Sequence, residues 1–337
     1  MSSTQSLNGA TGGDVAPLRI GVIGAGVMGS NHARVLATLP GVNLVGVVDP
    51  LEAHRQRATQ LAGCPTYERV EELLAEGVDA VTIAAPTHLH HEVSLACIAR
   101  GVHVLVEKPI ASTVAESQEI VSAARKAGVT LMAGHVERFN PAVVAIKKAI
   151  EGEDILSIAI ERVGPFPPRM SNVGVVIDLA VHDIDLIRWF TNSEIVEVQP
   201  QLSSAVAERE DIALLQFRTA SGVLAHINTN WLTPFKARSV TVATRHKYVM
   251  GDLITRQVTE CFGFQPDGAY SMRHLSVGHD EPLRAELLAF LEAVRTGATP
   301  PVTGEQAAAS LEIAIQCLEA RANDIAPAHQ TPRRVVG

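Results

Sequence analysis

The sequence predicts an α/β protein in which a doubly wound parallel sheet is followed by an α+β domain with a mostly antiparallel, open-faced sheet. Three observations predict it. Short apolar runs alternate with amphipathic stretches up to residue 134, and these runs are apolar throughout, as in strands that helices bury on both faces. Beyond residue 190, strand-like segments follow one another without helices between them. The 337 residues leave room for about two domains of roughly 150 residues each.

The composition excludes several classes of protein. The chain has 28 basic and 36 acidic side chains, a formal net charge of -8 and only 4% aromatic residues. Because it also lacks a Lys/Arg-rich run, it offers neither the basic surface nor the stacking platforms of a nucleic-acid binder. No run of about 18 uncharged apolar residues occurs, which argues against a membrane span.

The ends of the chain and its cysteines indicate the compartment. Residues 1–17 contain no basic residue and no apolar stretch, so we expect a flexible tail and not a secretory signal; residues 326–337 are expected to be a second tail. The four cysteines lie far apart and form no CxxC pair: Cys64, Cys97, Cys261 and Cys317. This spacing favours reduced, buried thiols over a zinc site or a disulfide framework, and therefore a cytoplasmic protein.

Residues 18–135 are expected to form the first domain. Strands are predicted at 18–23, 43–48, 79–85, 102–106 and 129–133, and helices at 29–39, 52–62, 68–76 and 89–99. Thr113 and Glu116 form a capping box that opens one more helix, and Gly128 closes it. Strand–helix alternation of this kind builds the parallel sheet of a Rossmann fold.

Residues 136–325 are expected to form the second domain. Helices are predicted at 141–150, 178–190, 282–295 and 303–321, strands at 155–163, 195–207, 213–219, 223–231 and 239–243, and a proline-rich loop at 164–168. Ser221 and Gly222 mark a hairpin turn between two of the strands. An exposed sheet face rich in Val, Leu and Ile would be a liability in a monomer, so we expect a homo-oligomer that associates through this sheet.

A glycine-rich motif stands where the first strand gives way to the first helix. Gly24, Gly26 and Gly29 form GxGxxG, with Val27 and Met28 between them. Gly24 permits a tight turn, Gly26 lets the backbone approach a pyrophosphate, and Gly29 lets the helix pack against the strand. Because the N-terminus of a helix attracts phosphate, the motif predicts a dinucleotide site.

Asp49 ends the next strand, 20 residues beyond Gly29. A carboxylate at this place accepts hydrogen bonds from ribose hydroxyls and repels a 2′-phosphate, which favours NAD over NADP. Arg55 and Arg57 are near enough in the sequence to offset this preference.

Two further strand ends are expected to face the same crevice. Thr87 and His90 follow the strand 79–85 and are expected to line its nicotinamide end. The alternative for Thr87 is helix capping, and His88 and His91 are interpreted as surface histidines.

Glu107, Lys108 and Pro109 follow the strand 102–106 and are expected to contact the cofactor. A nicotinamide cation and partial burial both disfavour the ammonium form of such a lysine, so Lys108 can share a proton with a hydroxyl or carbonyl. The alternative is an exposed lysine at a strand end.

Asp178, His182 and Asp185 stand at i, i+4 and i+7, which places them on one face of a helix. A carboxylate and an imidazole one turn apart suit proton transfer. The spacing could also hold a metal, but no further ligand with a fitting spacing stands out, and a helix cap at Asp178 with a buried His182 is the structural alternative.

Taken together, these motifs resemble the glucose–fructose oxidoreductase/inositol dehydrogenase/rhizopine catabolism (Gfo/Idh/MocA) family over about residues 18–325. In that family the Glu-Lys-Pro and Asp-x-x-x-His motifs carry the lysine and histidine of catalysis. The resemblance therefore implies an NAD-dependent dehydrogenase without a metal, in which Lys108, Asp178 and His182 are catalytic.

Two segments, residues 134–141 and 162–169, are similar to one branch of the family. That branch oxidises the 3-hydroxyl of UDP-N-acetylglucosamine, and an aminotransferase converts the product into a diamino sugar of lipid A. The resemblance implies a UDP-sugar substrate with the following candidate ligands: Arg138, Asn140, Arg162, Arg169, Asp178 and His182. Each arginine is equally a candidate for an ion pair. Another UDP-sugar, a free polyol such as inositol, and a non-catalytic NAD-binding sensor are the alternatives.

Overall fold

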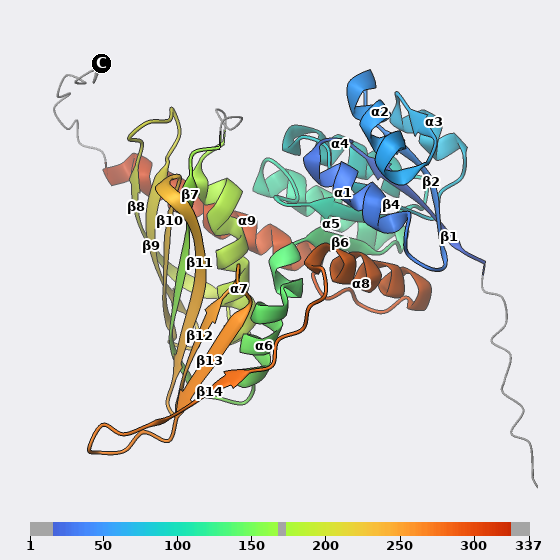
Figure 1. Ribbon diagram of the computed structural model, residues 1–337. Coiled ribbons are helices and arrows are strands. Elements are labelled where there is room, and N and C mark those ends of the chain that lie inside the picture. The colour runs from blue at the N-terminus through green and yellow to red at the C-terminus, as the bar shows by residue number, and fades with distance from the viewer. Residues whose placement is uncertain (1–15, 168–172, 325–337) are drawn as a thin grey trace, which may run out of the picture.

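The structure is a computed structural model that describes residues 16–167 and 173–324 (Figure 1). Almost all of the two expected tails, and the candidate residue Arg169, lie outside the described residues.

The first sheet has six strands in the order β3-β2-β1-β4-β5-β6, and all its pairs are parallel. The strands are β1 (Leu18–Ile23), β2 (Val42–Val48), β3 (Thr66–Tyr67), β4 (Ala80–Ile83), β5 (His103–Glu107) and β6 (Leu131–Gly134). The predicted doubly wound sheet is confirmed, although the two-residue β3 was not predicted. Because the strand order reverses between β1 and β4, the carboxyl ends of these strands open the crevice in which such sheets bind ligands.

Helices flank this sheet: α1 (Val27–Leu36), α2 (Glu52–Ala62), α3 (Val70–Ala75), α4 (Thr87–Ile98) and α5 (Val114–Ala127). The side chain of Thr113 accepts a hydrogen bond from the amide of Glu116, and Gly128 ends α5 with a φ of 66°. The predicted capping box and helix end are therefore confirmed.

The second sheet has eight strands in the order β14-β13-β12-β11-β7-β10-β9-β8. The strands are β7 (Ile155–Pro165), β8 (Ile195–Ser203), β9 (Ile212–Thr219), β10 (Leu224–Asn230), β11 (Leu232–Thr244), β12 (Lys247–Asp252), β13 (Gln257–Phe262) and β14 (Ser271–Leu275). Within the described part of the sheet only β10 and β7 pair in parallel, and the other pairs are antiparallel. The predicted antiparallel character and the hairpin between β9 and β10 are thus confirmed.

Three of these strands, β12, β13 and β14, were not predicted. β14 is exposed over most of its length, and β12 contains Gly251 and Asp252, residue types that are poor strand formers. β11 also starts seven residues before the predicted strand at 239–243. The strands at the β14 end of the sheet therefore lack the apolar signal by which the other strands could be recognised.

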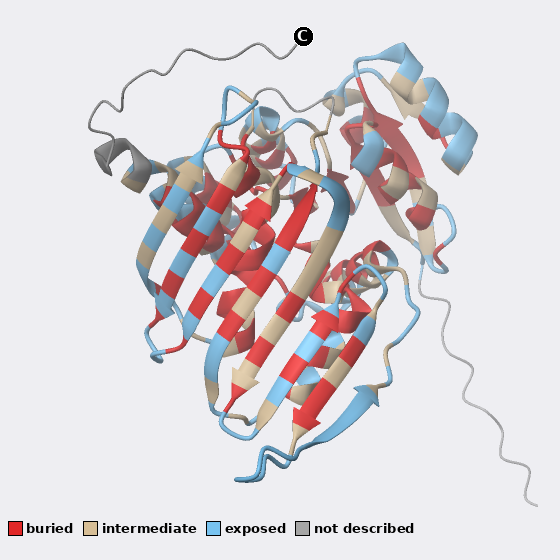
Figure 2. Cartoon of the chain, turned by 60° about the vertical axis from the view of Figure 1, so that its left-hand side comes forward, coloured by how far each residue is buried: buried red, intermediate tan, exposed pale blue. Residues whose placement is uncertain are grey.

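One face of the second sheet is covered and the other is open (Figure 2). Three helices contact its strands: α6 (Pro141–Ala149), α7 (Val181–Thr191) and α9 (Gly304–Asp324). Along β9 and β10 buried residues alternate with more exposed ones, and Leu214 and Leu224 on the open side each keep 50% of their surface exposed. The open face expected from the sequence is present, but it is less apolar than expected, because Gln216, Arg218 and His226 are exposed on it beside these leucines.

The last helices connect the two halves of the molecule (Figure 1). α8 (Pro282–Thr296) lies inside the span expected for the second domain, yet it contacts α1 and the short η1 turn (Val136–Phe139). Leu287 and Phe290 of α8 belong to the apolar core of the first sheet. α9 contacts both α5 and β8, so it ties the two halves together.

Two features of the described chain bear on its surroundings. The four cysteines are free and buried. None of the described helices combines the length and the apolar character needed to cross a bilayer.

Candidate active site

The glycine corner between β1 and α1 has the shape of a phosphate cradle. Gly24 has a φ of +93°, and a Cβ atom there would lie 2.6 Å from the amide nitrogen of Ala85. A Cβ atom on Gly29 would lie 1.7 Å from the carbonyl oxygen of Gly24, so this close approach requires glycine. At Gly26, by contrast, a Cβ atom would meet nothing within 4 Å. The corner is open where a pyrophosphate would approach the helix N-terminus, and Val27 and Met28 border it with exposed side chains.

Asp49 lies beside this corner, at the end of β2. Its Oδ2 accepts a hydrogen bond of 2.8 Å from the amide of Ala25, and its Oδ1 accepts one of 2.9 Å from the amide of Leu51. The guanidinium of Arg55 donates to the carbonyl oxygens of Asp49 and Pro50, at 2.7 and 3.0 Å. The carboxylate thus lies next to the glycine corner at the carboxyl end of β2, and the residues present fit NAD.

The structure corrects the expectation for His90. This side chain is buried, and its ring nitrogens face the carbonyl oxygens of Pro109 and Ala85 at 2.9 and 2.8 Å. A neutral imidazole has one N–H, so it can donate to one of these carbonyl oxygens, and the buried ring lies between the segments that follow β4 and β5 instead of facing a cofactor. Thr87, the first residue of α4, is partly exposed at the crevice and makes no side-chain capping bond.

Glu107 also turns away from the crevice. Its Oε1 lies 3.0 Å from Nε2 of His32 in α1, and its Oε2 accepts a hydrogen bond of 3.1 Å from the amide of Lys108. The side chain is buried behind the strand end, so the expected direct contact of Glu107 with a cofactor is wrong. Pro109 is buried as well and follows a cis peptide bond.

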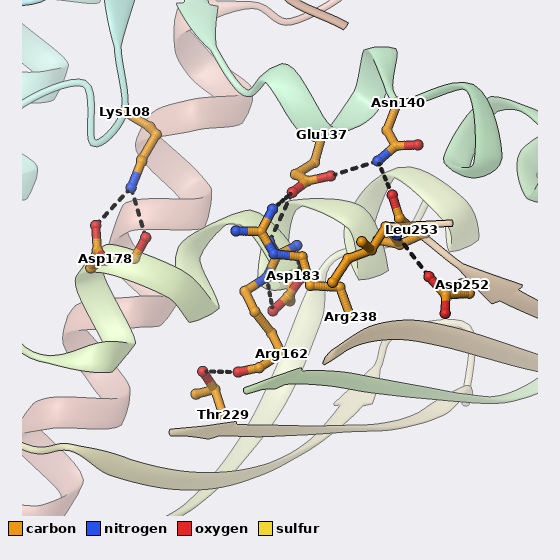
Figure 3. Close-up of polar contacts among 11 residues, drawn as sticks. Lys108, Glu137, Asn140, Arg162, Asp178, Asp183, Thr229, Arg238, Asp252 and Leu253 are labelled. Atoms are coloured by element: carbon orange, nitrogen blue, oxygen red, sulfur yellow. Dashed lines mark hydrogen bonds and ion pairs between the residues drawn. The ribbon is translucent and has the colours of Figure 1, made fainter. Parts of the chain in front are cut away.

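Lys108 points across the crevice to the second half of the chain (Figure 3). Its Nζ donates to the carbonyl oxygen of Asp178 at 2.7 Å and to Oδ1 of the same residue at 3.0 Å. The side chains of Lys108 and Asp178 are 19% and 23% exposed, so the ion pair is mostly buried but still in contact with solvent. Two residues that are 70 positions apart in the sequence therefore meet, as the motifs predicted.

Asp178 and His182 come from adjacent turns. Asp178 lies in a single π-helical turn, η2 (Val176–Ala180), and His182 follows in α7. His182 is 8% exposed, and its Nδ1 is buried without a hydrogen-bond partner. Burial, reinforced by the charge of Lys108, lowers the pKa of His182 well below its ordinary value. The imidazole is therefore neutral at neutral pH and carries a free lone pair that can accept a hydrogen bond from a hydroxyl.

Asp185, which was predicted to share one helix face with Asp178 and His182, has a structural role. It binds Arg138 through two bonds of 2.7 Å, and both side chains are buried. Arg138 also donates to the carbonyl oxygen of Pro301 at 3.0 Å and to the side chain of Gln306 at 2.9 Å, and its guanidinium lies 5.6 Å from the ring centroid of Trp189. Arg138 is therefore an interior ion-pair partner, and its expected contact with substrate is wrong.

Arg162 is likewise an interior residue (Figure 3). Its Nη2 donates to Asp183 at 2.7 Å and its Nη1 donates to Glu137 at 2.8 Å, with all three side chains buried. Asn140 caps α6 by accepting a hydrogen bond from the amide of Ala142, and its Nδ2 donates to Glu137 and to the carbonyl oxygen of Leu253. Neither Arg162 nor Asn140 is free to bind a substrate, because buried polar groups of this kind are held by the partners they already have.

Sequence reasoning missed Arg238 and His135. Arg238 of β11 donates to Glu137 at 3.1 Å, and its side chain remains 38% exposed. Its charge is one of several that, together with burial, lower the pKa of His182. The ring of His135 packs edge-on against that of His182, with centroids 6.0 Å apart. The local sequence around Arg238 contains no motif that would predict a place in the site. His135, by contrast, lies in the segment 134–141, which the sequence analysis had already identified by its resemblance to one branch of the family.

Comparisons with known proteins agree with this geometry. The family model described as "Oxidoreductase family, NAD-binding Rossmann fold" matches residues 18–135, and the model of the GFO/IDH/MocA C-terminal domain matches residues 159–249. The UDP-N-acetylglucosamine 3-dehydrogenase of Acidithiobacillus ferrooxidans is 32% identical over 240 residues, which cover 70% of this chain and 74% of that protein. The scyllo-inositol 2-dehydrogenase (NAD(+)) of Bacillus subtilis is 29% identical over 322 residues, which cover 88% and 92%.

A solved structure of the Acidithiobacillus ferrooxidans enzyme superposes with a TM-score of 0.84 at 27% identity, covering 91% of this chain and 98% of that one. Family models match both halves of the chain, and the relatives are named as dehydrogenases of sugar or polyol hydroxyls. The chain therefore belongs to the Gfo/Idh/MocA family of oxidoreductases and is an NAD-dependent dehydrogenase.

Proposed function

We propose that the protein oxidises the 3-hydroxyl of UDP-N-acetylglucosamine to the 3-keto sugar nucleotide, with NAD⁺ as the oxidant. The observation that supports a dehydrogenase assignment is the contact of Lys108 with Asp178, one helical turn before His182, whose pKa burial and the charge of Lys108 lower. The similarity in sequence and fold to the Acidithiobacillus ferrooxidans enzyme supports the choice of sugar.

We assign a separate role in the oxidation to each residue of the site. Bound NAD⁺ supplies the acceptor for the hydrogen and the electron pair that leave C3 of the sugar. His182, which burial keeps unprotonated, takes the proton of the 3-hydroxyl as the C3–H bond breaks, because the forming C=O group makes that proton strongly acidic. Lys108 donates a hydrogen bond to the same oxygen while Asp178 holds its Nζ in place. The C3–H and O–H bonds break as the C=O bond forms, so the products are the ketone, NADH and one proton.

Arg238 is the residue that we assign to the sugar nucleotide. Its guanidinium is partly exposed and donates a hydrogen bond to Glu137, whose carboxylate also accepts one from Arg162. A pyrophosphate needs a local cation in a chain of net charge -8, and a guanidinium binds phosphate oxygens in two-point contacts. This assignment replaces the arginines first expected, Arg138 and Arg162, which the interior ion pairs occupy.

Substrate choice is tested by thermal shift and by NADH formation with wild-type protein and NAD⁺. UDP-N-acetylglucosamine, UDP and myo-inositol are compared at equal concentration. We expect stabilisation by both UDP compounds and turnover only with the sugar nucleotide. Stabilisation and turnover with myo-inositol alone would reject the proposal.

An inositol dehydrogenase is the second candidate, and one observation favours it. The Bacillus subtilis relative aligns over 322 residues, against 240 for the Acidithiobacillus ferrooxidans relative. A free polyol has no pyrophosphate, so Arg238→Met would leave the KM for inositol unchanged but raise the KM for a UDP-sugar. The same variant thus discriminates between the two candidates.

The catalytic roles are tested with Lys108→Met and His182→Asn. Each removes a group that acts on the reacting hydroxyl, so we expect kcat to fall by at least about 100-fold, the usual range for a general acid–base group. Arg218→Met, an exposed surface change, serves as the control. Turnover near wild type in both site variants would contradict the assignment and would favour an NAD-binding sensor.

We also infer self-association through the open face of the second sheet, supported by the exposed leucines 214 and 224. Light scattering is expected to give a multiple of the monomer mass of 35.9 kDa and a lower mass for Leu224→Lys. A monomeric wild-type protein would contradict this inference.

We also expect the reaction to take place in the cytoplasm. Its 3-keto product belongs to the class of compounds that an aminotransferase uses as substrates.

A further inference from the structure

A buried cluster of titratable side chains lies directly behind Lys108 and takes no part in the chemistry above. His32 of α1, Glu107 of β5 and Glu286 of α8 offer side-chain atoms that all lie within 4.8 Å of one another. All three are buried, and Glu286 is 0% exposed. The cluster joins three elements that are far apart in the sequence, with the strand end that carries Lys108 at its centre.

Hydrogen bonding within the cluster is uneven. Glu107 faces Nε2 of His32 at 3.0 Å and accepts the amide of Lys108 at 3.1 Å. Glu286 has no hydrogen-bond partner on either carboxyl oxygen. Donors stabilise a negative charge on Glu107 and none stabilises one on Glu286, and burial of an uncompensated carboxylate is costly.

The charges around the cluster also favour a charged Glu107 and a neutral Glu286. The charged and titratable groups whose effects reach these carboxyls come from β5 (Lys108), from α1 (His32) and from His135 before the η1 turn. Burial raises the pKa of Glu286 well above its usual value, and the charge of Glu107 adds to this. Although burial opposes it, the hydrogen bond from His32 and the charge of Lys108 hold the pKa of Glu107 below its usual range.

The backbone makes room for this arrangement. Gly134 of β6 pairs with Glu107, and a Cβ atom there would lie 3.0 Å from both the Cα and Oε2 atoms of Glu107. Glycine at this position lets the Glu107 side chain fold back over its own strand. In this conformation its carboxylate binds the amide of Lys108, the residue whose Nζ reaches Asp178.

We propose that Glu286 is a positioning residue that remains a neutral carboxylic acid, while Glu107 carries the single negative charge of the pair. The neutral acid lets the Glu107 carboxylate stay buried against His32 and the amide of Lys108, and so fixes the strand end from which Lys108 reaches across the crevice. The role given to Lys108 rests on the function proposed above, whereas the proton on Glu286 does not.

The proton is located by infrared difference spectroscopy of the full-length protein at neutral pH. Wild type minus Glu286→Gln is expected to contain the C=O band of a protonated carboxylic acid, shifted in D₂O. Wild type minus Glu107→Gln is expected to contain a carboxylate band. A carboxylate band in the Glu286→Gln difference, or a carboxylic acid band in the Glu107→Gln difference, would overturn the proposal. So would a stoichiometric metal ion found by elemental analysis of the purified protein.

Positioning is tested by two substitutions of the same residue. Glu286→Leu keeps the size but removes the polar group, and Glu286→Gln restores a neutral hydrogen-bonding group. We expect kcat to fall by about 10- to 100-fold in the leucine variant, with little change in KM, and to recover in the glutamine variant, because small misplacements of a reacting group cost this much. Glu292→Gln, an exposed change on the same helix, is the matched control.

Equal kcat in the leucine and glutamine variants would show that the side chain only fills space, and would overturn the positioning role. Thermal melting and binding of NADH, followed by its fluorescence, confirm that each variant is folded. If no sugar is turned over at all, the proposed function fails, while the infrared measurement still decides where the proton lies.

Discussion

Two buried polar clusters flank Lys108, and they balance charge in opposite ways. The cluster of His32, Glu107 and Glu286 in the first half holds two carboxyls without a guanidinium. The cluster in the second half combines two carboxylates with two guanidiniums: Glu137, Asp183, Arg162 and Arg238. The comparison teaches that guanidiniums allow buried carboxylates such as Asp183 and Glu137 to stay charged, whereas we propose that the cluster without one retains a proton.

Removing a central charge from the balanced cluster should have the largest effect on stability. Arg162→Met leaves Asp183, which is 0% exposed, without its main partner. Breaking one side of a buried ion pair typically costs about 3–5 kcal/mol, so we expect a loss of that size in the free energy of unfolding. Urea denaturation measures it.

The control for this prediction is Arg218→Met, which removes an exposed pair with Glu197 and should leave stability nearly unchanged. If Arg162→Met is as stable as the control, the second cluster does not hold its charges as described.

A drop in pH should have the next largest effect. His182 has a lowered pKa in the folded protein, so below the ordinary imidazole value of about 6.5 the unfolded chain binds a proton that the folded chain refuses. The contribution of His182 to the free energy of unfolding is therefore complete above pH 6.5. It decreases as the pH falls below this value, by at most about 1.4 kcal/mol per pH unit.

Urea denaturation at pH 7.5, 6.5 and 5.5 checks this with wild type and His182→Asn. His90 and His135 have lowered pKa values for the same reason, burial, and contribute to both slopes. The difference between the two proteins therefore isolates His182, and parallel slopes would refute its neutral state.

The smallest change in stability is expected at the exposed edge of the balanced cluster. Arg238 is partly solvent-exposed and makes one bond to Glu137, so Arg238→Met should cost less than about 1 kcal/mol. The KM for UDP-N-acetylglucosamine should nevertheless rise about tenfold, as expected for the loss of one charged contact, while the KM for NAD⁺ stays constant. Steady-state kinetics with each substrate varied in turn measure both values, and an unchanged sugar KM would remove Arg238 from the binding site.

The sequence predicted the first half of the molecule better than the second for a physical reason. Strands that are buried on both faces are continuous apolar runs, as in β4. In the six-stranded sheet of the first half, only the two-residue β3 was not predicted. In the second sheet one face is open, so exposed edge strands such as β14 lack an apolar pattern.

The same contrast holds for the site. Lys108, Asp178 and His182 could be found because their motifs have fixed spacing. The interior position of Arg162 could not, because its partner Asp183 lies 21 residues away and nothing in the local sequence reveals the pairing. Arg138 and Asp185, 47 residues apart, pose the same problem.

The central claim is that the corner formed by Lys108, Asp178 and His182 removes hydrogen from C3 of a UDP-linked sugar. It is tested most directly with UDP-N-acetylglucosamine that carries deuterium at C3, followed by mass spectrometry of the reduced cofactor. The account predicts that the deuterium appears in NADH with wild-type protein and appears at least about 100-fold more slowly with Lys108→Met. Unlabelled NADH formed from this substrate, or no reduction at all by the wild-type protein, would contradict it.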